Sequence, residues 1–71
     1  MKAKFWRNYK GTKKGTVLKV VGLQIYRDGI ILDCKCPASE SIYWRYIFKS
    51  RKQFKNYIKL DNKYWKNYFR L

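Results

Sequence analysis

An Asp28-Gly29 pair lies between two apolar runs and is the strongest local structural signal in the chain. Such a pair supplies the positive φ angles of a two-residue hairpin turn, so residues 23–36 should form a β-hairpin. Its second arm alternates in polarity, which assigns one face to the core. That face carries Ile30, Leu32, Cys34 and Cys36. Asp33 and Lys35 fall on the opposite face.

Further strands are predicted on both sides of this hairpin. Residues 16–23 are rich in β-branched side chains, and residues 2–10 could add an edge strand beyond a turn at 11–15. After a loop at 37–41, residues 42–48 have the aromatic and branched composition of a half-buried strand. Alternation assigns one side of it to the core: Ile42, Trp44, Tyr46 and Phe48. The other side, which carries Arg45, should be more exposed.

The hydrophobic period changes after Lys49. Ser50 and Gln53 have the spacing of a helix capping box. On a helical wheel an apolar arc separates from a basic one. The two arcs are Phe54, Tyr57 and Ile58 against Arg51, Lys52, Lys55, Asn56 and Lys59.

Two continuations are open beyond this helix. A break at Leu60 would let Asp61 cap a second amphipathic helix that runs to residue 71. Alternatively, residues 57–60 form a closing strand. With the first continuation preferred, residues 1–71 are a single α+β domain. A small twisted antiparallel sheet, with an SH3-like open barrel as one form, would be followed by one or two C-terminal amphipathic helices.

Composition and charge together exclude several classes of function. The 71 residues include 18 Lys and Arg, 4 Asp and Glu and no His, a formal net charge of +14. Without His the chain lacks the usual general base and zinc ligand, so we expect neither an enzyme nor a metal or other cofactor. Four acids cannot pair most of the cations, which repel one another unless an anionic partner offsets them. The excess charge therefore predicts binding to an anionic partner.

The two cysteines are separated by a single residue. On a strand, Cys34 and Cys36 would share the core face at the limit of disulfide reach, so a vicinal redox pair remains an alternative to two buried thiols. Buried thiols in a reducing compartment are favoured. No apolar run approaches the roughly 20 residues of a membrane span, and no apolar stretch follows the basic N-terminus. These features predict a cytoplasmic protein.

The segment Gly-Thr-Lys-Lys-Gly-Thr-Val-Leu-Lys-Val at 11–20 resembles the glycine-centred loop and following strand of KOW-type, SH3-like small barrels. The resemblance covers residues 9 to about 35 at most. It implies binding to RNA or to nucleic-acid-associated machinery, as in ribosomal and transcription-elongation proteins. It also implies contacts through Lys13, Lys14, Gly15 and Lys19. The bias toward Lys, Asn, Tyr, Ile and Phe resembles that of small phage early proteins.

The predicted function is non-catalytic nucleic-acid binding, with structured RNA preferred over duplex DNA. Phosphates would meet a basic surface of loop, strand and helix cations: Lys13, Lys14, Lys19, Arg45, Arg51, Lys52, Lys55 and Lys59. Aromatic residues beside cations are candidates for base stacking: Trp6 and Tyr43, with Phe5 and Tyr9 as further ones. The remaining large aromatics are assigned to the core: Trp44, Tyr46, Phe48, Phe54, Tyr57 and Trp65.

Two other partners fit the same charge. A phage-type protein could dock on an acidic host protein and inhibit or redirect it, because positive charge also steers protein association. Attachment to anionic lipid through the C-terminal helix ranks last, because Trp65 and Phe69 are needed for burial.

Overall fold

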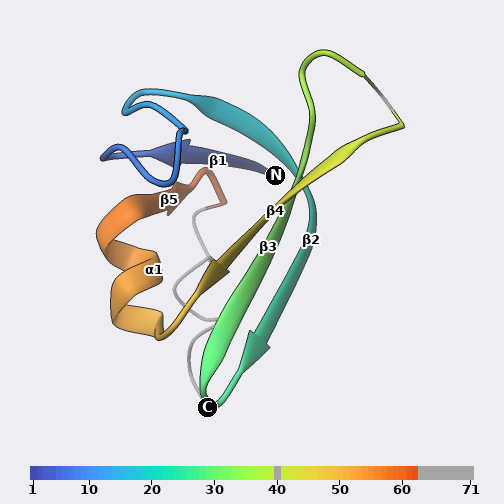
Figure 1. Cartoon of the computed structure of the whole chain (residues 1–71). Helices are drawn as coiled ribbons and strands as arrows, with labels where there is room; N and C mark the ends of the chain where they lie inside the picture. The colour runs from blue at the N-terminus through green and yellow to red at the C-terminus, as the bar shows by residue number, and fades with distance from the viewer. Residues whose placement is uncertain (40, 63–71) are drawn as a thin grey trace.

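The computed structural model describes residues 1–39 and 41–62 (Figure 1). The described strands form one antiparallel sheet in the order β4-β3-β2-β1-β5, and a short helix connects β4 to β5. The elements are β1 (Lys2–Phe5), β2 (Val17–Tyr26), β3 (Gly29–Lys35), β4 (Tyr43–Phe48), α1 (Arg51–Tyr57) and β5 (Ile58–Leu60).

Strand β2 belongs to both halves of the sheet. Its first part pairs with β1 and its second part with β3, and the pairing register shifts between Val20 and Gly22. Leu18 contributes to the core before this bulge, whereas Leu23 and Ile25 pack against the core after it. The inward-facing positions thus change from even to odd numbers, because one inserted residue reverses the alternation. Figure 1 shows β2 curving from the β1 and β5 group into the hairpin with β3.

Aromatic side chains from β1, the β1–β2 loop, β4 and α1 meet in the core. Phe48 lies between Phe54, at 5.1 Å edge-on, and Tyr9, at 4.7 Å in a stacked geometry. Phe5 of β1 meets Tyr46 of β4 with 5.0 Å between ring centroids. Such pairs are stabilising beyond the area they bury. Since β1 and β4 are not neighbours in the sheet, the Phe5–Tyr46 contact joins its two halves across the core.

The predicted hairpin is confirmed, but the reason given for its turn is wrong. Tyr26 pairs with Gly29, so the turn residues are Arg27 and Asp28, and none of these positions has a positive φ. Gly29 is favoured by close packing instead. A Cβ there would lie 3.0 Å from the carbonyl oxygen of Phe48 on the neighbouring strand.

The predicted helix start is confirmed. The Ser50 hydroxyl accepts a hydrogen bond from the Gln53 N–H at 3.1 Å. The Gln53 side chain accepts in turn from the Lys49 N–H at 2.6 Å. The first bond satisfies a backbone donor that a helix N-terminus leaves without an intrahelical partner, and the second fixes the residue before the N-cap.

The predicted fold class is wrong at the C-terminal side. The described part of the chain is mostly antiparallel sheet, and α1 has 7 residues inserted between two strands rather than following the sheet. At Ile58 the backbone becomes extended, and residues 58–60 pair with β1, as the alternative interpretation proposed. Strand geometry buries Ile58 and Leu60 together while Lys59 points outward. The second helix predicted up to residue 71 falls almost wholly on 63–71, outside the described residues.

Strand β1 is not the edge strand that was predicted. It lies between β2 and β5, so both of its sides are hydrogen-bonded. The alternation of Lys2, Ala3, Lys4 and Phe5 sends Ala3 and Phe5 into the core. Phe5 is therefore no stacking candidate, and the same holds for the buried Tyr9.

Both cysteines are buried free thiols, as expected, and neither forms a disulfide. None of the helices within residues 1–39 and 41–62 is long and apolar enough to cross a membrane.

The two strand glycines provide a matched test of the close approach at Gly29. Gly29→Ala should lower the free energy of unfolding by about 1 to 3 kcal/mol, because its methyl group would collide with a backbone carbonyl. Gly22→Ala meets only ordinary contacts, the nearest at 3.5 Å, and should be neutral or slightly stabilising. Urea unfolding of both variants checks this. Equal losses in the two would contradict it.

Burial makes stability sensitive to alkaline pH through Cys34. Burial, and secondarily the charge of Asp33, raises the pKa of its thiol from 9.0 to about 12. Between these values the folded state binds the extra proton, so the free energy of unfolding falls as pH rises, by up to about 1.4 kcal/mol per pH unit. In Cys34→Val the free energy of unfolding, measured with urea at each pH, should fall less steeply between about pH 8 and pH 10.5. An unchanged slope would exclude the thiol as its source.

Candidate nucleic-acid interface

Four lysines gather on the outer face of β5, β1 and β2: Lys2, Lys4, Lys19 and Lys59, hereafter the lysine face. Lys2 lies directly opposite Lys19 on one side of β1, and Lys4 lies directly opposite Lys59 on the other. All four side chains are exposed. Opposed residues of the same charge destabilise a sheet. An anion above this face would convert that repulsion into binding energy.

Two further residues border the lysine face. Asp61 lines a hollow of about 250 Å³ with Lys2, Lys4 and Lys59, and its carboxylate accepts the backbone N–H of Lys2 at 2.8 Å. Trp6 is 46% exposed, and the Lys59 ammonium lies 5.3 Å from the centre of its ring. The ring therefore borders the lysine face.

A larger open groove of about 650 Å³ lies between the β1–β2 loop and the start of β4. Lys10 and Lys13 of the loop line one wall, and Tyr43, Trp44 and Arg45 line the other. None of the described residues that line it is acidic. The groove thus combines cations with exposed aromatic surface, the two features of a single-strand binding site.

Trp44 is exposed at a position that faces inward. It pairs with Cys34, which is fully buried, yet Trp44 itself is 39% exposed. The next inward residue, Tyr46, is covered by the β1–β2 loop, where its hydroxyl lies 2.9 Å from the Thr12 hydroxyl. The loop does not extend over Trp44 in the same way. The prediction that Trp44 belongs to the core is therefore wrong, as is the inward assignment of the exposed Ile42.

The β1–β2 loop is held in a tight turn at Lys10 and Gly11. Tyr9 and Thr12 exchange backbone hydrogen bonds of 2.8 and 2.9 Å, and the two residues between them have φ angles of 44° and 85°. Positive φ at both central positions is typical of a type I′ turn, and it is unfavourable for lysine. The Tyr9 hydroxyl donates to the Ile47 carbonyl oxygen at 2.6 Å, which ties this loop to β4.

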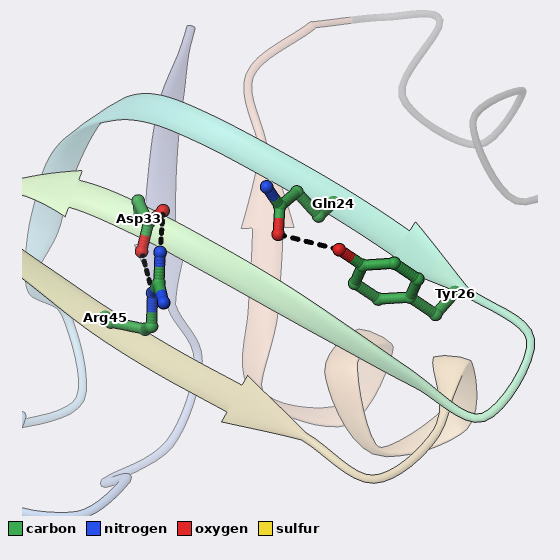
Figure 2. A network of polar contacts seen from close by, with 4 residues as sticks. All are labelled: Gln24, Tyr26, Asp33 and Arg45. Carbon is green, nitrogen blue, oxygen red and sulfur yellow. Dashed lines mark hydrogen bonds and ion pairs between the residues drawn. The ribbon is translucent and has the colours of Figure 1, made fainter.

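Arg45 is fixed at the rim of the groove by Asp33. Its Nε and a terminal nitrogen donate to the two carboxylate oxygens at 2.9 and 3.2 Å, from β4 to β3 (Figure 2). The Gln24–Tyr26 bond in the same view, at 3.0 Å, lies within β2. Because Asp33 neutralises part of the charge of Arg45, the groove cations with the most charge to offer a ligand are those of the loop.

A third hollow, of about 350 Å³, connects these regions. It lies where β2 and β3 diverge beyond their last pair, Val20 and Cys34, and its lining includes Lys19 and Lys35. It shares Leu18 and Pro37 with the groove. It shares Val17 with the hollow of the lysine face. The third hollow therefore shares lining residues with each of the other two.

The structure divides the predicted basic surface into separate places. Lys13, Arg45 and Tyr43 line the groove, whereas Lys19 and Lys59 belong to the lysine face, with Trp6 beside Lys59. Lys14 is exposed in the loop, where its N–H donates to the Asn8 side chain at 2.7 Å.

The predicted four-cation helix arc does not exist. Lys59 extends from β5, and Arg51 is half-buried, with its Nε atom buried and without a hydrogen-bond partner. Of the cations of α1, Lys52 and Lys55 are the exposed ones. The arc was drawn for a continuous helix, which ends before Lys59.

Sequence reasoning missed Lys2, Lys4, Lys10 and Trp44 as site residues. The alternation of lysine with Ala3 and Phe5 was a usable signal for the first two, because it is typical of a strand with one solvated face. The exposure of Trp44 had no signal in the sequence, because it depends on where the β1–β2 loop ends.

No group of three or more His, Cys, Asp or Glu side chains that could hold a metal ion occurs among the residues that the structure describes. Comparison with protein-family models, with curated proteins and with solved structures finds no match for this chain. Any function must therefore be inferred from its own residues.

Two variants in the β1–β2 loop separate the effect of charge on stability from the effect of backbone strain. Lys10→Asn should keep or raise the melting temperature, because asparagine adopts positive φ more readily, and the strain on lysine is about 1 kcal/mol or more. Lys13→Asn removes the same charge, at a position without positive φ, and should bring no such gain. Thermal unfolding followed by circular dichroism measures both. A lower melting temperature for Lys10→Asn than for Lys13→Asn would contradict this.

Proposed function

We propose that the protein is a non-catalytic nucleic-acid-binding protein that holds phosphates on the lysine face and in the adjoining groove. The observation that carries the proposal is the direct opposition of Lys2 to Lys19 and of Lys4 to Lys59. One carboxylate, that of Asp61, lines the hollow with Lys2, Lys4 and Lys59, so a single acid faces three ammonium groups there. The phosphates of a nucleic acid would supply the negative charge that the ammonium groups of the lysine face lack.

RNA is the preferred partner in this proposal, and the cytoplasm its place of action. The resemblance of residues 11–20 to KOW-type loops remains a prediction, and it agrees with the positions of Lys13 in the groove and Lys19 on the lysine face. Exposed aromatic rings beside cations favour RNA, whose unpaired bases are available for stacking. Trp6 and Tyr43 are both such rings, 46% and 60% exposed.

Salt dependence tests the proposal. If about five phosphates are neutralised, log K should fall with log salt at a slope near −4.5 on a duplex and near −3.5 on a single strand. Lys4→Gln with Lys59→Gln should reduce the slope by about 1.8 on a duplex or about 1.4 on a single strand. The melting temperature should hold or rise, because an opposed pair of like charges is removed. Fluorescence anisotropy over a salt series gives these values.

The control variant removes two charges from elsewhere. Arg27→Gln with Lys49→Gln changes the turn after β2 and the residue after β4, neither of which lines any of the three hollows. Its slope should equal that of the unchanged protein. The proposal fails if no nucleic acid binds in about 50 mM salt or if the slope is zero. Retention of an acidic protein after nuclease treatment, with no nucleic-acid binding, would instead support the alternative partner.

A further inference from the structure

We propose that the groove between the β1–β2 loop and β4 binds an unpaired nucleotide, with the base stacked on Trp44 and the phosphates next to Lys10 and Lys13. This inference rests on the proposed function and adds the form of the nucleic acid, a single strand or an unpaired loop rather than a continuous duplex.

The exposure of Trp44 is the first support. A tryptophan at an inward-facing position is expected to be covered, as Tyr46 is on the same side of β4. Instead its ring borders a groove of about 650 Å³ that lies open to solvent. This volume falls within the range of about 300 to 1,000 Å³ found for sites that bind small molecules. The groove therefore has an aromatic surface and space for a planar group against it.

The charges around the ring are the second support. Lys10 and Lys13 lie on the loop wall facing β4, whereas the Arg45 side chain points to the opposite face of the strand, where it pairs with Asp33. Lys10 is kept at this wall by a backbone conformation that is unfavourable for its residue type. Its ammonium also lies 5.5 Å from the centre of the Tyr9 ring. Cations on the wall opposite an exposed aromatic ring suit a ligand whose planar base is followed by a phosphate.

The path to the groove is the third support. The hollow lined by Lys19 and Lys35 adjoins the groove at Leu18 and Pro37, and it adjoins the lysine face at Val17. A single strand could follow this line and place phosphates near cations at each step. A duplex could rest on the lysine face, but its stacked bases cannot enter the groove without being unpaired.

The test compares oligonucleotides with and without bases. A uridine oligomer of about ten nucleotides, its deoxythymidine counterpart and an abasic oligomer of equal length present equal phosphate charge. The unchanged protein should bind the two base-bearing oligomers about 5- to 100-fold more tightly than the abasic one. Trp44→Ala should abolish this difference without changing the salt slope, because no cation is removed.

Tyr26→Ala is the matched control, because this ring is similarly exposed, at 49%, but lines none of the three hollows. It should keep the preference for base-bearing oligomers. If Trp44→Ala keeps it as well, the inference is overturned while the proposed function stands. If the unchanged protein binds no oligomer and no duplex at low salt, both are overturned.

A second measurement does not depend on truncating Trp44. The chain has 3 tryptophans, so Trp6→Phe with Trp65→Phe leaves Trp44 as the sole one. Its fluorescence should be quenched when the uridine or deoxythymidine oligomer binds, and should be unchanged when the abasic oligomer binds. Equal responses to base-bearing and abasic oligomers would overturn the inference even if Trp44→Ala failed to fold.

Discussion

The shift of register between Val20 and Gly22 is the constraint on which the rest of the structure depends. It lets one strand pair with β1 on one side of the bulge and with β3 on the other while both parts face the same core. Without the extra residue, strict alternation would turn one set of apolar side chains outward. The Phe5–Tyr46 contact between the two halves requires this bend. The groove requires it too, because its walls come from opposite halves of the sheet.

Charged side chains and buried side chains lie on opposite faces of the same strands. Among residues 1–39 and 41–62 no polar or charged residue is buried, and the lysines of β1 and β5 alternate with core residues along the same strands. Each of these short strands therefore builds a core on one face and a basic surface on the other. The stability of such a small core is modest. Repulsion between opposed lysines reduces it further, and a polyanion would restore it by binding only the folded form.

The aromatic residues divide by position rather than by type. Tyr9, Tyr46 and Phe48 are joined by ring contacts and covered, whereas Trp6 and Trp44 have substantial exposed surface. Trp44 and Tyr46 are two residues apart on the same side of one strand, and only Tyr46 is covered by the β1–β2 loop. The place where that loop ends therefore decides that Tyr46 belongs to the core and that Trp44 belongs to the candidate binding surface. The same loop carries Lys10 and Lys13, so one segment covers the core and supplies cations to the groove.

Local chemistry in the sequence was sufficient for the hairpin at 23–36, for the inward face of β3 and for the start of α1 at Ser50. Each of these depends on neighbouring residues: period-2 alternation, a short turn and a side chain that caps the helix. The net charge predicts an anionic partner, and this stays a prediction.

Long-range pairing decided what the sequence left open. Residues 58–60 fit a helix arc as well as a strand, and the free side of β1 selected the strand by burying Ile58 and Leu60. That pairing also moved Lys59 from the helix to a position opposite Lys4, and thereby created the lysine face. The exposure of Trp44 was likewise decided by a loop more than 30 residues earlier in the chain, at Thr12. Local patterns determine which residues can share a face, but only packing between distant segments determines which faces are covered and which remain open to a ligand.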